Sequence, residues 1–115
     1  MTQKARKNNS IGIDVVEVSR FNSFNKIDHS VEKIFSDYEI KYCLAYKEPS
    51  VHFAGIFAAK EAVSKALGTS KYPFIELEIR HAKDGSPGVW NKGKKLKISV
   101  SITHTSKIAI AVALS

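Results

Sequence analysis

The chain has 115 residues, of which 43% are hydrophobic and 25% charged, a balance typical of one folded globular domain and not of a disordered or fibrous chain. A single cysteine, Cys43, excludes an intrachain disulfide and a cysteine-rich zinc site, and it favours a reducing cytoplasm. Eighteen lysines and arginines against eleven acidic residues give a formal net charge of +7, which favours an anionic partner such as a nucleic acid, a phosphorylated ligand or an acidic protein.

The N-terminal residues 1–9 are polar and basic and lack apolar periodicity. They are therefore expected to form a flexible extension, and residues 10–115 are expected to form the single folded domain. The most apolar run, at 108–114, is too short to cross a bilayer, so no membrane association is expected.

The first predicted element is a strand that begins at residue 11. Ile11, Ile13 and Val15 fall on one side of an extended chain, and Gly12 and Asp14 fall on the other. A carboxylate at this position is either solvated or held for chemistry, and the strand pattern alone leaves both possibilities open.

Two short helices are expected after this strand. Val18, Phe21 and Phe24 recur at a spacing of three, which predicts a short helix with Arg20 on its polar side. The segment 29–35 fits a second short helix.

Two longer helices follow. Ser36 and Glu39 have the spacing of a capping box, in which each side chain accepts a hydrogen bond from the other's backbone N–H, and they predict a helix over 37–46. The longest helix is predicted from residue 50 to Gly68, a residue suited to a left-handed C-terminal cap.

The longest helix carries charged residues among its apolar positions. Its apolar stripe comprises Phe53, Ile56, Phe57, Val63 and Leu67. Lys60 falls inside this stripe, where an ammonium group must extend to solvent, pair with a carboxylate or meet an anion. Glu61 and Lys65 are spaced i, i+4, and a surface ion pair between them would be enough to explain their presence on the helix. Glu61 could instead join Asp14 around Mg²⁺, which prefers oxygen ligands.

The C-terminal part is predicted to be mostly extended. Residues 74–79 alternate as a strand, 83–95 fit a loop or ragged hairpin, and 98–104 and 108–114 fit two strands joined by a tight turn. The last two strands have small residues on alternate positions, which we expect to form one small face suited to close approach by a helix or another subunit. The predicted fold class is α+β, with an antiparallel sheet packed on the long central helix.

Three segments of the chain are similar, in the same order, to motifs of the holo-[acyl-carrier-protein] synthases, the small 4'-phosphopantetheinyl transferases. They are IGIDVVEVSRF at 11–21, FAGIFAAKEAVSKALG at 53–68 and VSITHTSKIAIAVAL at 100–114. This resemblance implies a phosphopantetheinyl transferase-like fold. It also implies transfer of 4'-phosphopantetheine from coenzyme A to a serine of apo-acyl-carrier protein in fatty acid biosynthesis, which releases adenosine 3',5'-bisphosphate.

The resemblance also assigns roles to residues of this chain. Asp14 and Glu61 are expected to bind Mg²⁺ beside the coenzyme A pyrophosphate, and with Lys65 they form the expected catalytic set. The expected coenzyme A-binding residues are Lys60, Lys65, Gly68, Thr69, Ser101, His104 and Thr105. Arg20 and Phe21 are expected to contact an acidic acyl-carrier protein. Members of the family form trimers with active sites between subunits, so a homotrimer is expected.

Three departures from the family pattern keep another interpretation open. Family members commonly carry arginine where this chain has Ile56, so a positive side chain expected at or near the coenzyme pocket is absent. The loop after Gly68 is short, and NKGKKLK at 91–97 is too short for the helix often present there. The chain could therefore be a catalytically degenerate homologue that still binds the carrier protein.

The other alternative is a basic nucleic-acid-binding module. No recognised nucleic-acid-binding motif occurs in the sequence, and Phe21, Phe53 and Phe57 follow core spacing and not the pattern of an exposed stacking platform. The sequence therefore favours the transferase, with no nucleic-acid partner.

Overall fold

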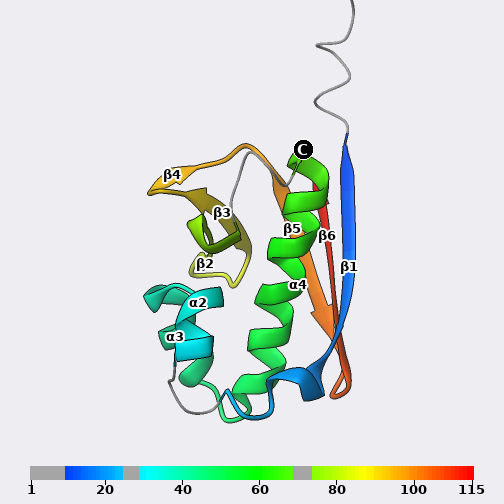
Figure 1. Cartoon of the computed structure of the whole chain (residues 1–115). Helices are drawn as coiled ribbons and strands as arrows, with labels where there is room; N and C mark the ends of the chain where they lie inside the picture. Colours follow the sequence, from blue (N-terminus) through cyan, green and yellow to red (C-terminus); the bar gives the residue numbers. More distant parts are fainter. Residues whose placement is uncertain (1–9, 25–28, 69–73) are drawn as a thin grey trace, which may run out of the picture.

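The computed structural model describes residues 10–24, 29–68 and 74–115, so the predicted extension at 1–9 lies outside the described residues. Figure 1 shows the elements in chain order. They are β1 (Ile11–Glu17), the 3-10 turn η1 (Val18–Phe21), α2 (His29–Ile34), α3 (Asp37–Leu44), α4 (Pro49–Leu67), the 3-10 turn η2 (Phe74–Glu76), β2 (Leu77–His81), β3 (Pro87–Asn91), β4 (Lys94–Lys95), β5 (Ser99–His104) and β6 (Ile108–Leu114).

The strands form two antiparallel sheets with α4 between them. One sheet has the order β1-β6-β5 and the other has the order β2-β3-β4. In Figure 1 the first sheet covers one side of α4, and the second sheet lies on the other side together with α2 and α3. The predicted α+β arrangement is confirmed. The lysine-rich segment predicted as a loop or ragged hairpin forms the hairpin of β3 and β4, which joins β2 in the second sheet.

Small residues allow α4 to lie very close to the first sheet. A Cβ atom added to Gly12 would lie 1.9 Å from the carbonyl oxygen of Ala62 and 2.9 Å from the backbone nitrogen of Ala66. On β6, the helix-facing side chains are also small and buried: Ala109, Ala111 and Ala113. A helix of the same chain therefore covers this small face, which was one of the two predicted occupants.

The strand register corrects the prediction of a single small face on the last two strands. Ser101 lies opposite Val112, and Ile102 lies opposite Ala111. Residues that are directly opposite in an antiparallel pair share a face, so the serines of β5 and the alanines of β6 lie on different faces. The face toward α4 combines Ile102 with alanines, and the outer face combines Ser101 with large apolar residues.

The six phenylalanines of the chain pack together between α4 and the short helices. Their contacting ring centroids are 4.8 to 6.1 Å apart, and the rings are those of Phe21, Phe24, Phe35, Phe53, Phe57 and Phe74. Phe21 is 2% exposed and Phe53 is fully buried. The predicted core role of these two side chains is confirmed.

Local signals in the sequence set the ends of the helices. The capping box at the start of α3 is confirmed, since Ser36 and Glu39 exchange the two expected hydrogen bonds at 2.9 and 3.2 Å. Gly68 follows α4 with φ of +94°, a conformation that favours glycine. In the part of the chain that the structure describes, no helix combines the length and the apolar character needed to span a membrane.

Trp90 is the single tryptophan of the chain and lies in β3. The guanidinium carbon of Arg80 is 4.8 Å from its ring centroid, and the ammonium nitrogen of Lys95 is 5.3 Å from it. Cations over an aromatic face are attracted by its electron density. The indole ring therefore helps to fix two of the basic side chains of the second sheet.

Candidate active site

The structure brings Asp14 and Lys65 together although they are 51 residues apart in the chain. The Nζ atom of Lys65 donates a hydrogen bond of 2.9 Å to the carbonyl oxygen of Ile13 and lies 3.3 Å from Oδ1 of Asp14. The Lys65 side chain is 52% exposed and the Asp14 side chain 19% exposed. Lys65 therefore pairs across to β1 and not with Glu61 on its own helix.

Glu61 lies one turn before Lys65 on α4 and is half-buried. Residues spaced i, i+4 on a helix have Cβ atoms about 5–6 Å apart, so Glu61 lies on the same side of α4 as Lys65. Its carboxylate has no hydrogen bond or ion pair to any described residue. Its oxygen atoms are therefore available to a ligand.

No group of three or more His, Cys, Asp or Glu side chains that could hold a metal ion occurs among the described residues. Asp14 and Glu61 can supply only two carboxylates. A cation held here would take the rest of its ligands from water or substrate, which is the usual arrangement for Mg²⁺.

Lys60 has a different environment from the one expected of a coenzyme-binding residue. Its Nζ atom lies 2.6 Å from Oε1 of Glu39 and donates a 3.0 Å hydrogen bond to the carbonyl oxygen of Ile34. The side chains of Lys60 and Glu39 are both fully buried. The prediction that Lys60 contacts coenzyme A is therefore wrong, because the ammonium group pairs inside the protein.

The buried pair connects three elements. Oε2 of Glu39 accepts a 2.7 Å hydrogen bond from the backbone N–H of Ile79 in β2, so α3, α4 and β2 meet at these charges. Burial raises the pKa of Glu39 and lowers the pKa of Lys60, and the attraction between the two charges opposes both shifts. Hydrogen bonds to every charged atom are what make such a pair tolerable in the interior.

The predicted carrier-protein residues differ in exposure. The Phe21 ring is buried among the other phenylalanines, so the prediction that Phe21 contacts a partner is wrong. Arg20 is exposed, and its guanidinium carbon lies 4.9 Å from the ring centroid of Phe57. A contact between Arg20 and a carrier protein stays a prediction.

Two predicted coenzyme-binding residues follow the C-terminal end of α4. Gly68 is exposed, and its N–H donates a 2.9 Å hydrogen bond to the carbonyl oxygen of Ser64. Gly68 lies in the turn that follows Lys65. Thr69 lies outside the described residues.

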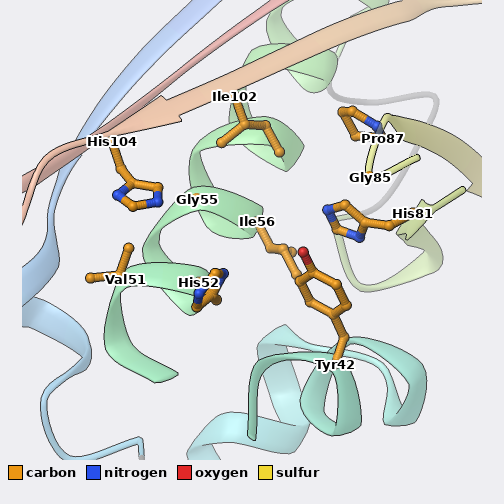
Figure 2. A pocket seen from close by; sticks show the side chains of 10 residues that line it. All are labelled: Tyr42, Val51, His52, Gly55, Ile56, His81, Gly85, Pro87, Ile102 and His104. Carbon is orange, nitrogen blue, oxygen red and sulfur yellow. The ribbon is translucent and has the colours of Figure 1, made fainter. Parts of the chain in front are cut away.

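The other predicted coenzyme-binding residues are on or just after β5. Ser101 is exposed on the outer face of the sheet. Oγ1 of Thr105 accepts hydrogen bonds of 3.1 Å from the N–H groups of Lys107 and Ile108, which stabilise the turn into β6. His104 is exposed and lines a hollow of about 170 Å³ (Figure 2).

The His104 hollow and the Asp14 pair lie on opposite flanks of α4. Asp14 is on β1, His104 is on β5, and β6 lies between these two strands. The structure therefore joins Asp14 and Lys65, with Glu61 beside them, but it does not bring His104 into the same cluster of one chain.

Sequence reasoning missed the aromatic residues that surround His104. His52, one helical turn before Ile56, stacks on Tyr46 with a centroid distance of 3.7 Å. His81 stacks on Tyr42 at 3.9 Å. The i, i+4 spacing of Tyr42 and Tyr46 and the position of His52 beside Ile56 were the available signals.

Comparison with known proteins defines the class of protein to which this site belongs. Residues 10–113 match the family model of the 4'-phosphopantetheinyl transferase superfamily. The chain therefore belongs to this family. It is 39% identical to a holo-[acyl-carrier-protein] synthase of Caldicellulosiruptor bescii, over 92% of this chain and 96% of that protein.

Two solved structures in complex with coenzyme A are also similar to this chain. The Helicobacter pylori holo-[acyl-carrier-protein] synthase with coenzyme A has a TM-score of 0.77 at 32% identity and covers 90% of this chain and 97% of its own. The Bacillus anthracis holo-(acyl-carrier-protein) synthase in complex with CoA (3',5'-ADP) has a TM-score of 0.76 at 30% identity, with 91% and 93% covered.

Proposed function

We propose that this chain transfers 4'-phosphopantetheine from coenzyme A to a serine of apo-acyl-carrier protein, as a holo-[acyl-carrier-protein] synthase of fatty acid biosynthesis. The observation that carries this proposal is the pairing of Lys65 with Asp14 across α4 and β1, beside the carboxylate of Glu61, which pairs with none of the described residues. The family match over 10–113 and the coenzyme A complexes of two relatives support it. Residues 10–115 would act as one domain.

Asp14 and Glu61 fit a bound Mg²⁺ by the chemistry of their donor atoms. Both are carboxylates, they come from elements that pack on each other, and Glu61 has no hydrogen bond or ion pair within the part of the chain that the structure describes. Mg²⁺ is held typically by one or two carboxylates together with water and substrate phosphates. Bound there, it would supply charge neutralisation on the pyrophosphate.

The transfer itself forms one bond and breaks one. The serine oxygen bonds to the phosphorus that carries the pantetheine arm, and the bond from this phosphorus to the bridging oxygen breaks, so adenosine 3',5'-bisphosphate leaves. Lys65, oriented by the carbonyl oxygen of Ile13, would stabilise or protonate the leaving phosphate. Glu61 is the proposed base for the serine proton.

A homotrimer is proposed because the outer face of the first sheet is apolar and exposed in the single chain. Its large exposed side chains are Ile11 at 67%, Ile13 at 60%, Val15 at 60%, Val112 at 39% and Leu114 at 51%. Contiguous apolar surface of this kind marks an interface. Sites between subunits would also explain why His104 and Asp14 lie on opposite flanks of α4.

Light scattering after gel filtration tests the trimer. Ile13→Lys places a charge on the apolar face and is expected to give a monomer with little transfer activity. Ala82→Lys adds the same charge at an exposed position in the turn between β2 and β3 and is expected to stay trimeric. A monomeric unmodified protein would contradict the proposal.

One assay tests the transfer. The protein is incubated with coenzyme A, Mg²⁺ and an apo-carrier protein, and the added arm is detected by mass. We expect product with the unmodified protein and none with Asp14→Ala or Glu61→Ala, while both variants still bind the carrier. Carrier binding without product in the unmodified protein would favour the degenerate homologue, and salt-sensitive binding of nucleic acid alone would favour the basic module.

We further infer that Arg20 contacts the acidic carrier protein and that the chain works in the cytoplasm. Arg20 is exposed and cationic, so Arg20→Glu is expected to raise the KM for the carrier with little change in kcat. The cytoplasmic location is inferred from Cys43, which is buried and not in a disulfide.

A further inference from the structure

The second sheet turns one face away from the core, and Trp90 lies at the centre of that face. The strand register places Glu78 and Lys95 opposite Trp90 on either side, and residues directly opposite in antiparallel strands share a face. Ile79 and Val89, which follow and precede in the chain, are fully buried on the other face. The face of Trp90 is therefore the outer one.

Lysines of the β3–β4 hairpin surround this tryptophan. The segment 92–97 contains four lysines and no acidic residue, and all four lysines are exposed. Nζ of Lys92 lies 3.7 Å from Oε2 of Glu76. The other three have no ion pair with a described residue: Lys94, Lys95 and Lys97. Several uncompensated charges so close together favour a partner with several negative charges.

Trp90 holds two cations in place before any partner arrives. The guanidinium carbon of Arg80 and the Nζ atom of Lys95 lie 4.8 and 5.3 Å from its ring centroid. A Cβ atom at Gly88 would lie 2.8 Å from the indole ring, so the glycine leaves room for the ring to lie along β3. Side chains that are already ordered lose less entropy when a partner binds.

A groove of about 240 Å³ lies beside the indole ring and is lined by residues of α3, β2, β3 and β4. Its walls include Tyr38, Arg80, Trp90 and Lys95. The Tyr38 hydroxyl accepts a 3.2 Å hydrogen bond from the backbone N–H of His81, which fixes that wall. Tyrosine, tryptophan and arginine are the residues most enriched at the centres of protein interfaces, and charged residues form the rim.

The arrangement favours an acidic protein over a nucleic acid or a membrane. Because Arg80 and Lys95 already lie over the indole ring, the ring is not free to stack on a base. Trp90 is also only partly exposed, so it does not project as an apolar anchor into a lipid layer. Carboxylates on a protein surface match ammonium and guanidinium groups directly.

We propose that this lysine surface, made up of Arg80, Trp90, Lys92, Lys94, Lys95 and Lys97, is a second docking surface for the acidic acyl-carrier protein. The inference rests on the proposed function, which supplies the acidic partner. The surface is separate from Arg20: in Figure 1, β4 lies toward the end of α4 that carries Lys65, and η1 lies at the other end. It also leaves free the apolar face of the first sheet, where the trimer contact is proposed.

Charges of this kind act on association. Exposed charges around an interface mainly change the rate of encounter and its salt dependence, and such steering changes association rates by about 10–10³-fold. The effect is screened over about 10 Å at 0.1 M salt and about 3 Å at 1 M salt. The lysine surface is therefore expected to lower the KM for the carrier protein at low salt and to leave kcat unchanged.

Charge reversal tests the inference in the full chain. Lys94→Glu/Lys95→Glu is expected to raise the KM for apo-carrier protein about tenfold at low salt, with kcat and the KM for coenzyme A unchanged and with little difference left at about 1 M salt. The control Lys33→Glu/Lys47→Glu changes the net charge equally at exposed positions outside the lysine surface. Its KM for the carrier is expected to change less than about twofold.

The emission of Trp90, the single tryptophan of the chain, measures docking without turnover. Addition of a carrier protein that lacks tryptophan is expected to change this emission, and apo- and holo-carrier are expected to act alike because the lysine surface does not contact the modified serine. Lys94→Glu/Lys95→Glu is expected to lose the change at the same carrier concentration. Circular dichroism checks that both double variants are folded.

Three results would overturn the inference alone while transfer by the unmodified protein continues. They are an unchanged KM for the carrier in Lys94→Glu/Lys95→Glu, an equal rise in the control variant, and binding of nucleic acid or anionic vesicles that this variant loses while it keeps carrier binding. If the unmodified protein neither modifies nor binds the carrier, the inference and the proposed function fail together.

Discussion

Two lysines five residues apart on α4 have opposite surroundings. The Lys60 side chain is fully buried and lies 2.6 Å from Glu39, whereas the Lys65 side chain is 52% exposed and lies 3.3 Å from Asp14. Both pair with a carboxylate from elsewhere in the chain. Exposure separates them, because an exposed pair can exchange its partner for a ligand and a fully buried pair cannot.

The difference in exposure between Lys60 and Lys65 shows that two parts of α4 have different roles. Around Lys60 the helix is anchored to α3 and β2 through the buried charges of the Lys60–Glu39 pair. Near its C-terminal end the helix presents Lys65 to solvent beside β1. One continuous helix therefore holds the second sheet in place and orients a cation at the proposed site.

The largest expected effect is on catalysis. Lys65→Met is expected to lower the transfer rate about 10²–10⁴-fold, because the leaving phosphate loses its cation. The free energy of unfolding is expected to change by about 1 kcal/mol or less, because the pair is exposed. Mass-detected transfer and urea unfolding measure the two. A loss of activity smaller than about tenfold would remove Lys65 from the catalytic set.

The matched change at the buried position is expected to act on stability. Lys60→Met is expected to lower the free energy of unfolding by about 3–5 kcal/mol, since it leaves the Glu39 carboxylate buried and unpaired. The double variant Lys60→Met/Glu39→Gln is expected to regain part of this loss. Urea unfolding measures both variants. A single variant as stable as the unmodified protein would contradict the assigned role of the pair.

A change that moves β1 away from α4 is expected to affect stability and catalysis together. Gly12→Ala puts a Cβ 1.9 Å from the carbonyl oxygen of Ala62, and such overpacking costs about 1–3 kcal/mol or more. Transfer is expected to fall as well, because Asp14 is on the displaced strand. Gly55→Ala is the control, since among the described residues its Cβ would meet only the side chain of Ile102, at 3.1 Å. Equal effects of the two variants would contradict this interpretation.

The smallest expected effect is the pH dependence of the Lys60→Met loss. Burial raises the pKa of Glu39, and without Lys60 the protonated carboxyl is favoured still more in the folded state. The stability gained by protonation is present below the unfolded pKa and lost as pH rises through the folded pKa. The loss is therefore expected to be smaller at about pH 5 than at about pH 8, by about 1.4 kcal/mol for each unit of pKa difference. Urea unfolding at both pH values checks it.

Features that depend on neighbouring residues could be predicted from the sequence. The capping box of Ser36 and Glu39, the glycine that follows α4 and the alternation of the strands all depend on contacts within a few residues. The position of Lys60 inside the apolar stripe also predicted that its ammonium group must extend to solvent, pair with a carboxylate or meet an anion, and the structure shows the second of these. The partner of Lys60 could not be predicted. The sequence assigned Glu39 to the helix cap, and in the structure the same oxygen, Oε1, accepts from the backbone of Ser36 and also pairs with Lys60.

Features that depend on pairing between distant segments could not be predicted. Which face of β5 meets α4 depends on its register with β6, and a shift of one residue exchanges the faces. The placement of His81 beside Tyr42 likewise requires β2 to pack next to α3. The sequence therefore named the residues of the candidate site but not their geometry. The fold brings Asp14 and Lys65 together and separates Lys60 from them.

The single tryptophan gives the molecule an intrinsic optical reporter. Trp90 is flanked by Arg80 and Lys95 in the second sheet, and β3 also supplies Pro87 to the wall of the His104 hollow. Its fluorescence is therefore expected to respond to ligands in that hollow without an attached dye. Since the first sheet contains no tryptophan, emission follows the melting of the second sheet, and circular dichroism follows the whole chain.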